Sequence, residues 1–234
     1  MIARFPTPPP AAASHPGITP SVLLLDFGSV ISFSVFERHR QTERALHLPA
    51  GTLTWLGPLD PDTDPLWCSM QRDEISERDY WATRARELGE AVGETGWDMA
   101  TMLARANEGD PNDVVRPEIV RLIRRAREAG IRVGVLSNEV ELFYGVDFMR
   151  RIEVLRHMDA IVDATHTKIL KPDPRAYSLV LDAMGCRARD ALFVDDQFRN
   201  IAGAVQMGLQ AQYFDLRDVG GNLAAVAARL KITM

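Results

Sequence analysis

Residues 21–30 read SVLLLDFGSV, a short unbroken apolar run that ends in the carboxylate of Asp26. Such a run, bounded by polar residues, is typical of a strand buried on both faces of a parallel sheet. The same pattern recurs in IRVGVL at 131–136, before Ser137-Asn138, and in ALFVD at 191–195, before Asp196. Shorter apolar runs at 160–163 and 211–214 predict two further strands.

Amphipathic helical patterns separate these runs. Apolar residues at i, i+3, i+4 and i+7 spacing begin at Ile119, Tyr177 and Leu223, and each set makes one stripe that can lie on a sheet. Strands that alternate with helices predict an α/β fold with a Rossmann-like, doubly wound parallel sheet. Ligands of such sheets bind at the carboxyl ends of the strands, where the polar residues described above would meet.

Residues 33–113 interrupt this alternation and contain all four tryptophans. We expect them to form an inserted α-helical cap over the strand ends, with helices at 36–48, 65–88 and 97–108. The catalytic core would then comprise residues 21–32 and 114–234. The first 20 residues carry six prolines, which prevent a regular helix, and we expect them to be a flexible leader.

Composition excludes several classes of protein. The net charge is −5 and no long basic run occurs, so the sequence predicts no nucleic-acid partner and no anionic membrane surface as partner. No apolar stretch approaches the ~20 residues of a membrane span. Cys68 and Cys186 are far apart and lack metal-ligand spacing, which indicates reduced thiols and a cytoplasmic location. The oligomeric state cannot be read from the sequence.

A carboxylate at a strand end suits attack on phosphorus. In Asp26-Phe27-Gly28-Ser29 the strand would fix the carboxylate, and Gly28 would let the backbone turn closely around a small anion. Asp26 could equally well cap a turn. Asp195-Asp196 could bind a hard cation through oxygen ligands, or could be a pair of acidic residues at a loop entry.

Two further segments fit the same chemistry. Lys171, stiffened by Pro172 and Pro174, could neutralise a transferred phosphoryl group, or could be a solvated surface lysine. Ser137-Asn138 could donate hydrogen bonds to phosphate oxygens, although the pair is unremarkable at a turn. The order of these segments and their placement at strand ends carry more weight than any one of them.

Taken together, the segments LLLDFGSVI, VGVLSN, KPDPRAY and FVDDQFRNIAGAVQMG resemble the four motifs of the haloacid dehalogenase superfamily. The resemblance covers residues 21–215. It is closest to the subgroup with D-x-G-x-V in the first motif, which includes bacterial sugar-phosphate phosphatases and resembles the phosphatase domain of soluble epoxide hydrolases. The stretch WCSMQRDEISERDYW resembles the cap of that subgroup, although Asp73 stands where glycine is usual.

The resemblance implies a hydrolase that acts on a small phosphomonoester with Mg²⁺. Asp26 would form an aspartyl-phosphate, while Ser137, Lys171 and Asn138 would contact the substrate. The metal would be bound by Asp26, the Gly28 carbonyl and Asp196, with Asp195 close by or bound through water, and Asn200 would support the loop after Asp196. The catalytic residues that the resemblance implies are Asp26, Ser137 and Lys171.

The first motif departs from that of many phosphatases of the superfamily, which place a second aspartate two positions after the nucleophile. Gly28 stands there instead, so we expect a slow phosphatase, one limited to good leaving groups, or one whose acid/base comes from the cap. Two alternatives stay open: a metal-independent 2-haloacid dehalogenase, against which Asp195-Asp196 argues, and a non-catalytic binding protein that retains the fold. The substrate cannot be named from the sequence.

Overall fold

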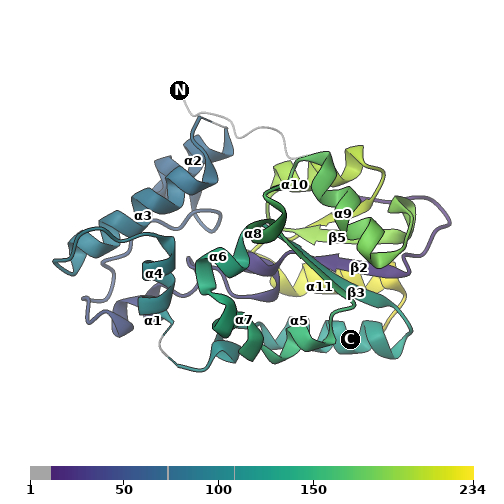
Figure 1. Cartoon of the computed structure of the whole chain (residues 1–234), viewed down its shortest axis with the longest axis horizontal. Helices are drawn as coiled ribbons and strands as arrows, with labels where there is room; N and C mark the ends of the chain where they lie inside the picture. The colour runs from purple at the N-terminus through teal and green to yellow at the C-terminus, as the bar shows by residue number, and fades with distance from the viewer. Residues whose placement is uncertain (1–11, 73, 108) are drawn as a thin grey trace.

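The computed structural model describes residues 12–234 except 73 and 108. Within this range six strands form one sheet in the order β1-β6-β5-β2-β3-β4 (Figure 1). The strands from β6 to β4 are parallel, whereas β1 is antiparallel to β6. Their bounds are β1 Ala12–Ala13, β2 Val22–Leu25, β3 Arg132–Ser137, β4 Ala160–Asp163, β5 Ala191–Asp195 and β6 Gln210–Tyr213.

Helices occupy most of the rest of the chain. Their bounds are α1 His39–Ala45, α2 Pro65–Gln71, α3 Glu77–Ala91, α4 Met99–Ala106, α5 Pro117–Glu128, α6 Val140–Tyr144, α7 Val146–Arg151, α8 Ala164–Thr167, α9 Pro174–Met184, α10 Phe198–Gln206 and α11 Val219–Leu230. In the part of the chain that the structure covers, no helix combines the length and the apolar character needed to cross a membrane.

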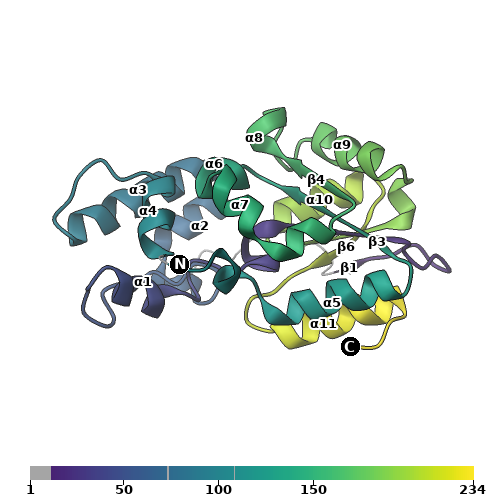
Figure 2. The same cartoon turned by 60° about the horizontal axis from the view of Figure 1, so that its bottom comes forward.

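The sheet has helices on both faces, which confirms the predicted doubly wound α/β fold. Successive residues of β2 point to opposite faces, as a strand requires. Leu23 and Leu25 pack in the layer of α5 and α11, while Val22 and Leu24 pack in the layer of α9 and α10. Figure 2 shows α5 and α11 side by side beneath the sheet. All four residues of β2 are fully buried, which explains the unbroken apolar run.

Helices α1 to α4 form a separate body beside the sheet, with a core of its own rich in aromatic residues (Figure 1). The chain enters and leaves this body along two paired segments, since Ser32 and Val115 form an antiparallel bridge. The phenyl ring of Phe36 lies 5.3 Å from the ring of Trp67 and 5.7 Å from that of Trp55. The division into a core and a cap at residues 33 and 113 stays a prediction.

Two of the three expected cap helices, at 36–48 and 97–108, are shorter than predicted, and the third is divided in two. The helix expected at 65–88 is two helices, because Ser76 begins α3 with a capping box: its hydroxyl accepts from the Asp79 amide at 3.1 Å, and the Asp79 carboxylate accepts from the Ser76 amide at 3.2 Å. Asp98 similarly caps α4, which starts at Met99 rather than 97. Residue 73, where the cap motif departs from the usual glycine, lies outside the described residues.

The expected leader at residues 1–20 is held against the core from Ala12 onward, which corrects that prediction for its second half. Ala12 and Ala13 pair with Gln212 and Ala211 of β6, and the guanidinium of Arg229 donates to the Ala13 carbonyl. The prolines that preclude a helix are compatible with such an edge strand. Residues 1–11 lie outside the described part of the chain.

Candidate active site

Three strand ends bring the predicted site residues together. Leu25 of β2 pairs with Val135 of β3 and Val194 of β5, so that Asp26 and Asp195 follow in register and Ser137 comes one position later, all at one edge of the sheet. One pocket is lined by all the residues that sequence reasoning assigned to the site except Asp195, which lies behind it; they are Asp26, Gly28, Ser137, Asn138, Lys171, Asp196 and Asn200.

The segment after Asp26 turns tightly, but not at the glycine. Gly28 has an ordinary extended backbone (φ −62°, ψ 131°), and the left-handed residue is Ser29 (φ 65°). The turn therefore does not use the conformational freedom of Gly28, while the close approach of the backbone to a small anion stays a prediction. The guanidinium of Arg116 holds the turn by donating to the Ser29 carbonyl at 3.0 and 3.1 Å, and Arg116 is itself ion-paired with Glu37.

Lys171 lies buried between two carboxylates. Its Nζ is 2.8 Å from Asp26 Oδ1 and 2.7 Å from Asp195 Oδ2, and only 1% of the side chain is exposed. Burial opposes a charged amine, but the negative charges of Asp195 and Asp26 outweigh it and raise the pKa of Lys171. The ammonium is therefore charged throughout the physiological range, and the predicted alternative of a solvated surface lysine is wrong.

Asn138 holds the backbone of Lys171. Its Oδ1 accepts from the Lys171 amide at 2.8 Å, and its Nδ2 donates to the Lys171 carbonyl at 3.3 Å. Both ends of the Asn138 amide are thus engaged, which differs from the expected contact with substrate. In this arrangement Asn138 fixes the loop from which Lys171 reaches the strand ends.

Asp195 is fully buried and its oxygens are bonded to protein groups. Besides Lys171, Asp195 accepts from the Gln197 amide at 2.8 Å and from Asn200 Nδ2 at 3.0 and 3.1 Å. Asn200, expected to support the loop after Asp196, contacts Asp195 itself. Tyr177 donates to the Asn200 carbonyl at 2.7 Å, which anchors this residue in turn.

The three aspartates make a compact acidic cluster. One oxygen from each of Asp26, Asp195 and Asp196 lies within 4.8 Å of the others. Burial and the charge of Asp195 raise the pKa of Asp26 to about 6, although Lys171 opposes the change. Burial, Asp195 and Asp26 together raise the pKa of Asp196 well above its ordinary value. A divalent cation would relieve this repulsion, and hard cations prefer oxygen ligands, so the cluster can hold Mg²⁺.

The cap contributes site residues that the sequence did not single out. Glu77, at the start of α3, lines the pocket and pairs with Arg199 at 2.7 Å. Arg78, the next residue, pairs with the buried Glu139, which follows Asn138 in the chain. The spacing of Glu77 and Trp81 places both on one face of α3, but no local pattern indicates which core residues that face meets.

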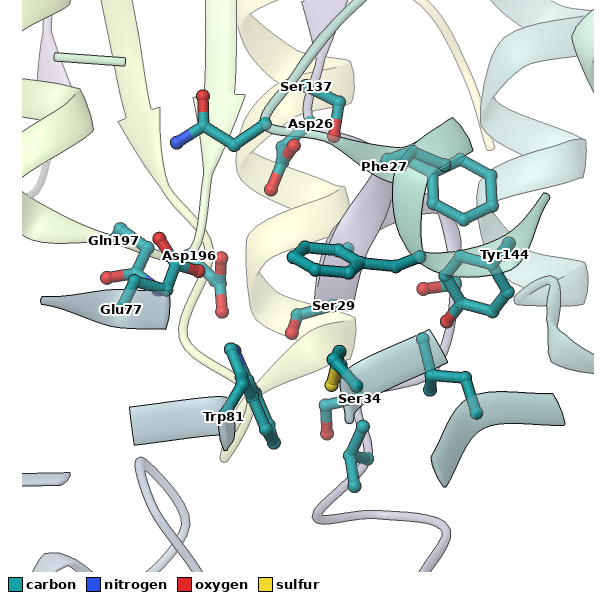
Figure 3. Close-up of a pocket in the computed structure, with 18 of the residues that line it drawn as sticks. Asp26, Phe27, Ser29, Ser34, Glu77, Trp81, Ser137, Tyr144, Asp196 and Gln197 are labelled. Atoms are coloured by element: carbon teal, nitrogen blue, oxygen red, sulfur yellow. The ribbon is translucent and has the colours of Figure 1, made fainter. Parts of the chain in front are cut away.

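The pocket is a hollow of about 760 Å³ measured out to its open mouth, between the strand ends and the cap. Figure 3 shows Asp26 and Ser137 on one side and Trp81 and Ser34 on the opposite side, with Asp196 and Glu77 together at its edge. Polar groups therefore converge on the sheet side, and aromatic side chains close the cap side.

Comparison with known proteins agrees with this geometry. A family model described as haloacid dehalogenase-like hydrolase matches residues 21–208. A phosphatase of Mycobacterium tuberculosis, MT3486, is 29% identical over 99 residues, which are 42% of this chain and 46% of that protein. The chain spans less than half the length of the curated relatives that it matches most strongly.

Two solved structures share the fold at low identity. The hydrolase YfnB of Bacillus subtilis, solved with bound magnesium, superposes with a TM-score of 0.60 at 19% identity, covering 82% of this chain and 86% of that one. The L-2-haloacid dehalogenase of Xanthobacter autotrophicus gives a TM-score of 0.53 at 18% identity, over 82% and 76% of the two chains. At these identities the likeness concerns the fold alone.

Proposed function

Since the chain belongs to the haloacid dehalogenase-like hydrolase family, we propose that it is a magnesium-dependent phosphohydrolase that acts on a small phosphomonoester through Asp26. The observation that carries this proposal is the acidic cluster of Asp26, Asp195 and Asp196, whose oxygens lie within 4.8 Å at the strand ends. Displacement at carbon gains little from a cation site, whereas phosphoryl transfer depends on charge neutralisation. The name of the mycobacterial relative, a phosphatase, agrees with this choice.

Asp26 is the proposed nucleophile. One carboxylate oxygen would attack phosphorus, the bond from phosphorus to the ester oxygen would break, and an aspartyl-phosphate would form while the ester oxygen takes up a proton and leaves as the alcohol. Water would then attack this phosphorus, which releases inorganic phosphate and restores the carboxylate. The end of β2 fixes Asp26, because its amide donates to the Val194 carbonyl at 2.9 Å.

Lys171 and Ser137 are the proposed ligands of the phosphoryl oxygens. The Lys171 ammonium is already within 2.8 Å of Asp26, which places it beside the reacting group. Preorganised charges of this kind act most strongly in a water-poor site. We assign Asn138 and Asn200 positioning roles, since Asn138 bonds the backbone of Lys171 and Asn200 bonds Asp195.

Asp26, the Gly28 carbonyl and Asp196 are the proposed metal ligands. Mg²⁺ held there would neutralise the substrate phosphate and lessen its repulsion from the nucleophile. Asp195 is better suited to orienting Lys171 than to direct ligation, because its oxygens already accept from Lys171, Asn200 and the Gln197 amide. No acidic side chain stands at position 28, and among the described pocket residues Glu77 is the carboxylate that the cap supplies.

The test is phosphate release from a panel of phosphomonoesters with Mg²⁺ and with EDTA. Asp26→Asn should abolish turnover while the protein stays folded, and Asp196→Asn should raise the Mg²⁺ concentration needed for half-maximal rate. Equal phosphate release by wild type and Asp26→Asn would favour a non-catalytic role. Halide release from 2-haloacids that survives EDTA would make the protein a dehalogenase instead.

A further inference from the structure

The wall of the pocket that faces the acidic cluster is mostly apolar, and the hydroxyl of Ser34, which also lies there, donates to Glu37 at 2.7 Å. It is built largely from the cap and from α6, and the residues that matter here are Phe36, Trp67, Trp81, Met99, Leu103 and Tyr144. Two cap helices turn one face each toward the hollow: Glu77 and Trp81 are four residues apart on α3, and Met99 and Leu103 are four apart on α4.

This wall rests on the aromatic core of the cap. The ring of Trp81 lies 4.9 Å from that of Tyr80 and 5.6 Å from that of Phe36, and Phe36 in turn contacts Trp67 at 5.3 Å. Trp81 is half-buried, whereas Tyr80 and Phe36 are buried. Rings packed closely in this way, two of the three pairs edge to face, keep a fixed surface, so the wall offers a preformed apolar seat for an organic group.

The pocket offers little unpaired positive charge to a ligand. Among its described lining residues Lys171 is the one basic side chain, and it lies within 2.8 Å of both Asp26 and Asp195. The nearby Arg199 is paired with Glu77. The proposed Mg²⁺ would be taken up by Asp26, Asp196 and the phosphate itself. A second anionic group on a ligand would therefore be desolvated with no unpaired basic side chain among the described lining residues, which is strongly unfavourable.

We infer that the substrate is a monophosphate ester of an uncharged, largely apolar alcohol, whose organic part lies against Trp81 and the Met99–Leu103 face of α4. This inference rests on the proposed function and specifies its substrate class. It excludes bisphosphates and phosphorylated acids as good substrates, because each would place a second negative charge on the cap side. The phosphate would lie at the strand ends and the apolar group under the cap (Figure 3).

Three primary alkyl phosphates test this inference with matched leaving groups: 3-phenylpropyl phosphate, 4-phosphooxybutanoate and propane-1,3-diyl bisphosphate. With Mg²⁺, kcat/KM for the phenyl compound should exceed that for each of the other two by at least about tenfold, as expected for filling an apolar pocket. Hydrolysis with equal or reversed preference would overturn the inference and leave the phosphatase proposal standing.

A binding measurement covers the case in which no phosphate ester is hydrolysed, which would sink the proposed function itself. Calorimetry with Mg²⁺ should then still show tighter binding of 4-phenylbutylphosphonate than of 5-phosphonopentanoate, again by at least about tenfold. Equal affinities, or tighter binding of the carboxylated compound, would overturn the apolar assignment independently of turnover.

Two tryptophan variants locate the seat. Trp81→Leu should lower the ratio of kcat/KM for 3-phenylpropyl phosphate to kcat/KM for propyl phosphate about tenfold, because the phenyl group would lose its aromatic contact. Trp97→Leu is the matched control: Trp97 is a buried cap tryptophan that does not line the pocket, so the ratio between the two compounds should not change. Thermal unfolding of both variants checks that they fold. Equal ratios for Trp81→Leu and wild type would refute the placement.

Discussion

Replacing Asp26 by asparagine should make the metal-free protein more stable. Asp26 is 8% exposed and lies within an acidic cluster, and burial raises the pKa of its carboxyl to about 6 from an ordinary 3.8. The folded protein therefore disfavours the charged form even with Lys171 beside it. A neutral amide of the same shape removes this cost and with it the proposed nucleophile, as expected where function and stability compete.

The magnitude follows from the change in pKa. At ~1.4 kcal/mol per pH unit, the ionised carboxylate destabilises the folded state by about 3 kcal/mol at pH 8. Because the pKa of the folded state is the higher one, protonation favours folding: this cost shrinks as the pH falls through 6 toward 3.8. The gain from Asp26→Asn should accordingly be about 3 kcal/mol at pH 8 and about half of that at pH 5.

Urea unfolding in EDTA at pH 8 and pH 5 measures this difference. Asp195→Asn is the matched control, since it also removes a carboxylate from Lys171. It should destabilise the protein by about 1–3 kcal/mol, because its new NH₂ group would face the donors of Asn200 and the Gln197 amide.

Saturating Mg²⁺ should stabilise wild type by about 2.7 kcal/mol at 100 times Kd and Asp26→Asn by less. A stability of Asp26→Asn equal to or below that of wild type at pH 8 would refute the reasoning.

Two further predictions concern single residues. Burial lowers the pKa of His39 to about 4, with Glu43 and Asp64 opposing, so the folded state holds the imidazole neutral and loses about 2 kcal/mol of stability between pH 7 and pH 5. Urea unfolding of His39→Phe should lack this loss, and an unchanged pH dependence would contradict it. At Gly28, an added Cβ would lie 3.9 Å from Asp26 Oδ2 and within 4 Å of no other atom outside the two neighbouring residues, so Gly28→Asp should fit. It should raise kcat for phenyl phosphate by about 10²-fold more than for 4-nitrophenyl phosphate; a similar gain in Gly28→Asn would speak against acid catalysis.

The sheet and the convergence of the site could be predicted because each depends on a short local pattern. Every β2 residue is buried on both faces, so its apolar run marks the strand to within a residue at each end. Parallel strands end at the same edge of a sheet, so the sequence alone predicts that Asp26 and Ser137 lie close together. The capping residues Ser76 and Asp79 also mark the start of α3 at Glu77 in the sequence, although the predicted helix at 65–88 runs across them.

The cap side of the pocket could not be predicted in the same way. Glu77 meets Arg199 across 122 positions and Gln71 meets Gln197 across 126, and no periodicity specifies such pairs. The engagement of both amide atoms of Asn138 by Lys171 likewise depends on how two loops approach each other. These contacts arise from tertiary packing, so the sequence indicates the residues' chemistry without their partners.

The ion pairs between cap and core have a mechanical consequence. Arg78 forms an ion pair with Glu139, whose neighbour Asn138 is hydrogen-bonded to the backbone of Lys171. Glu77 forms an ion pair with Arg199, whose neighbour Asn200 is hydrogen-bonded to Asp195. The cap is thus ion-paired to the two segments that position Lys171 and Asp195. Movement of the cap away from the sheet would break both ion pairs and loosen both segments together. Release of a product would then be coupled to loosening of the groups that had held it.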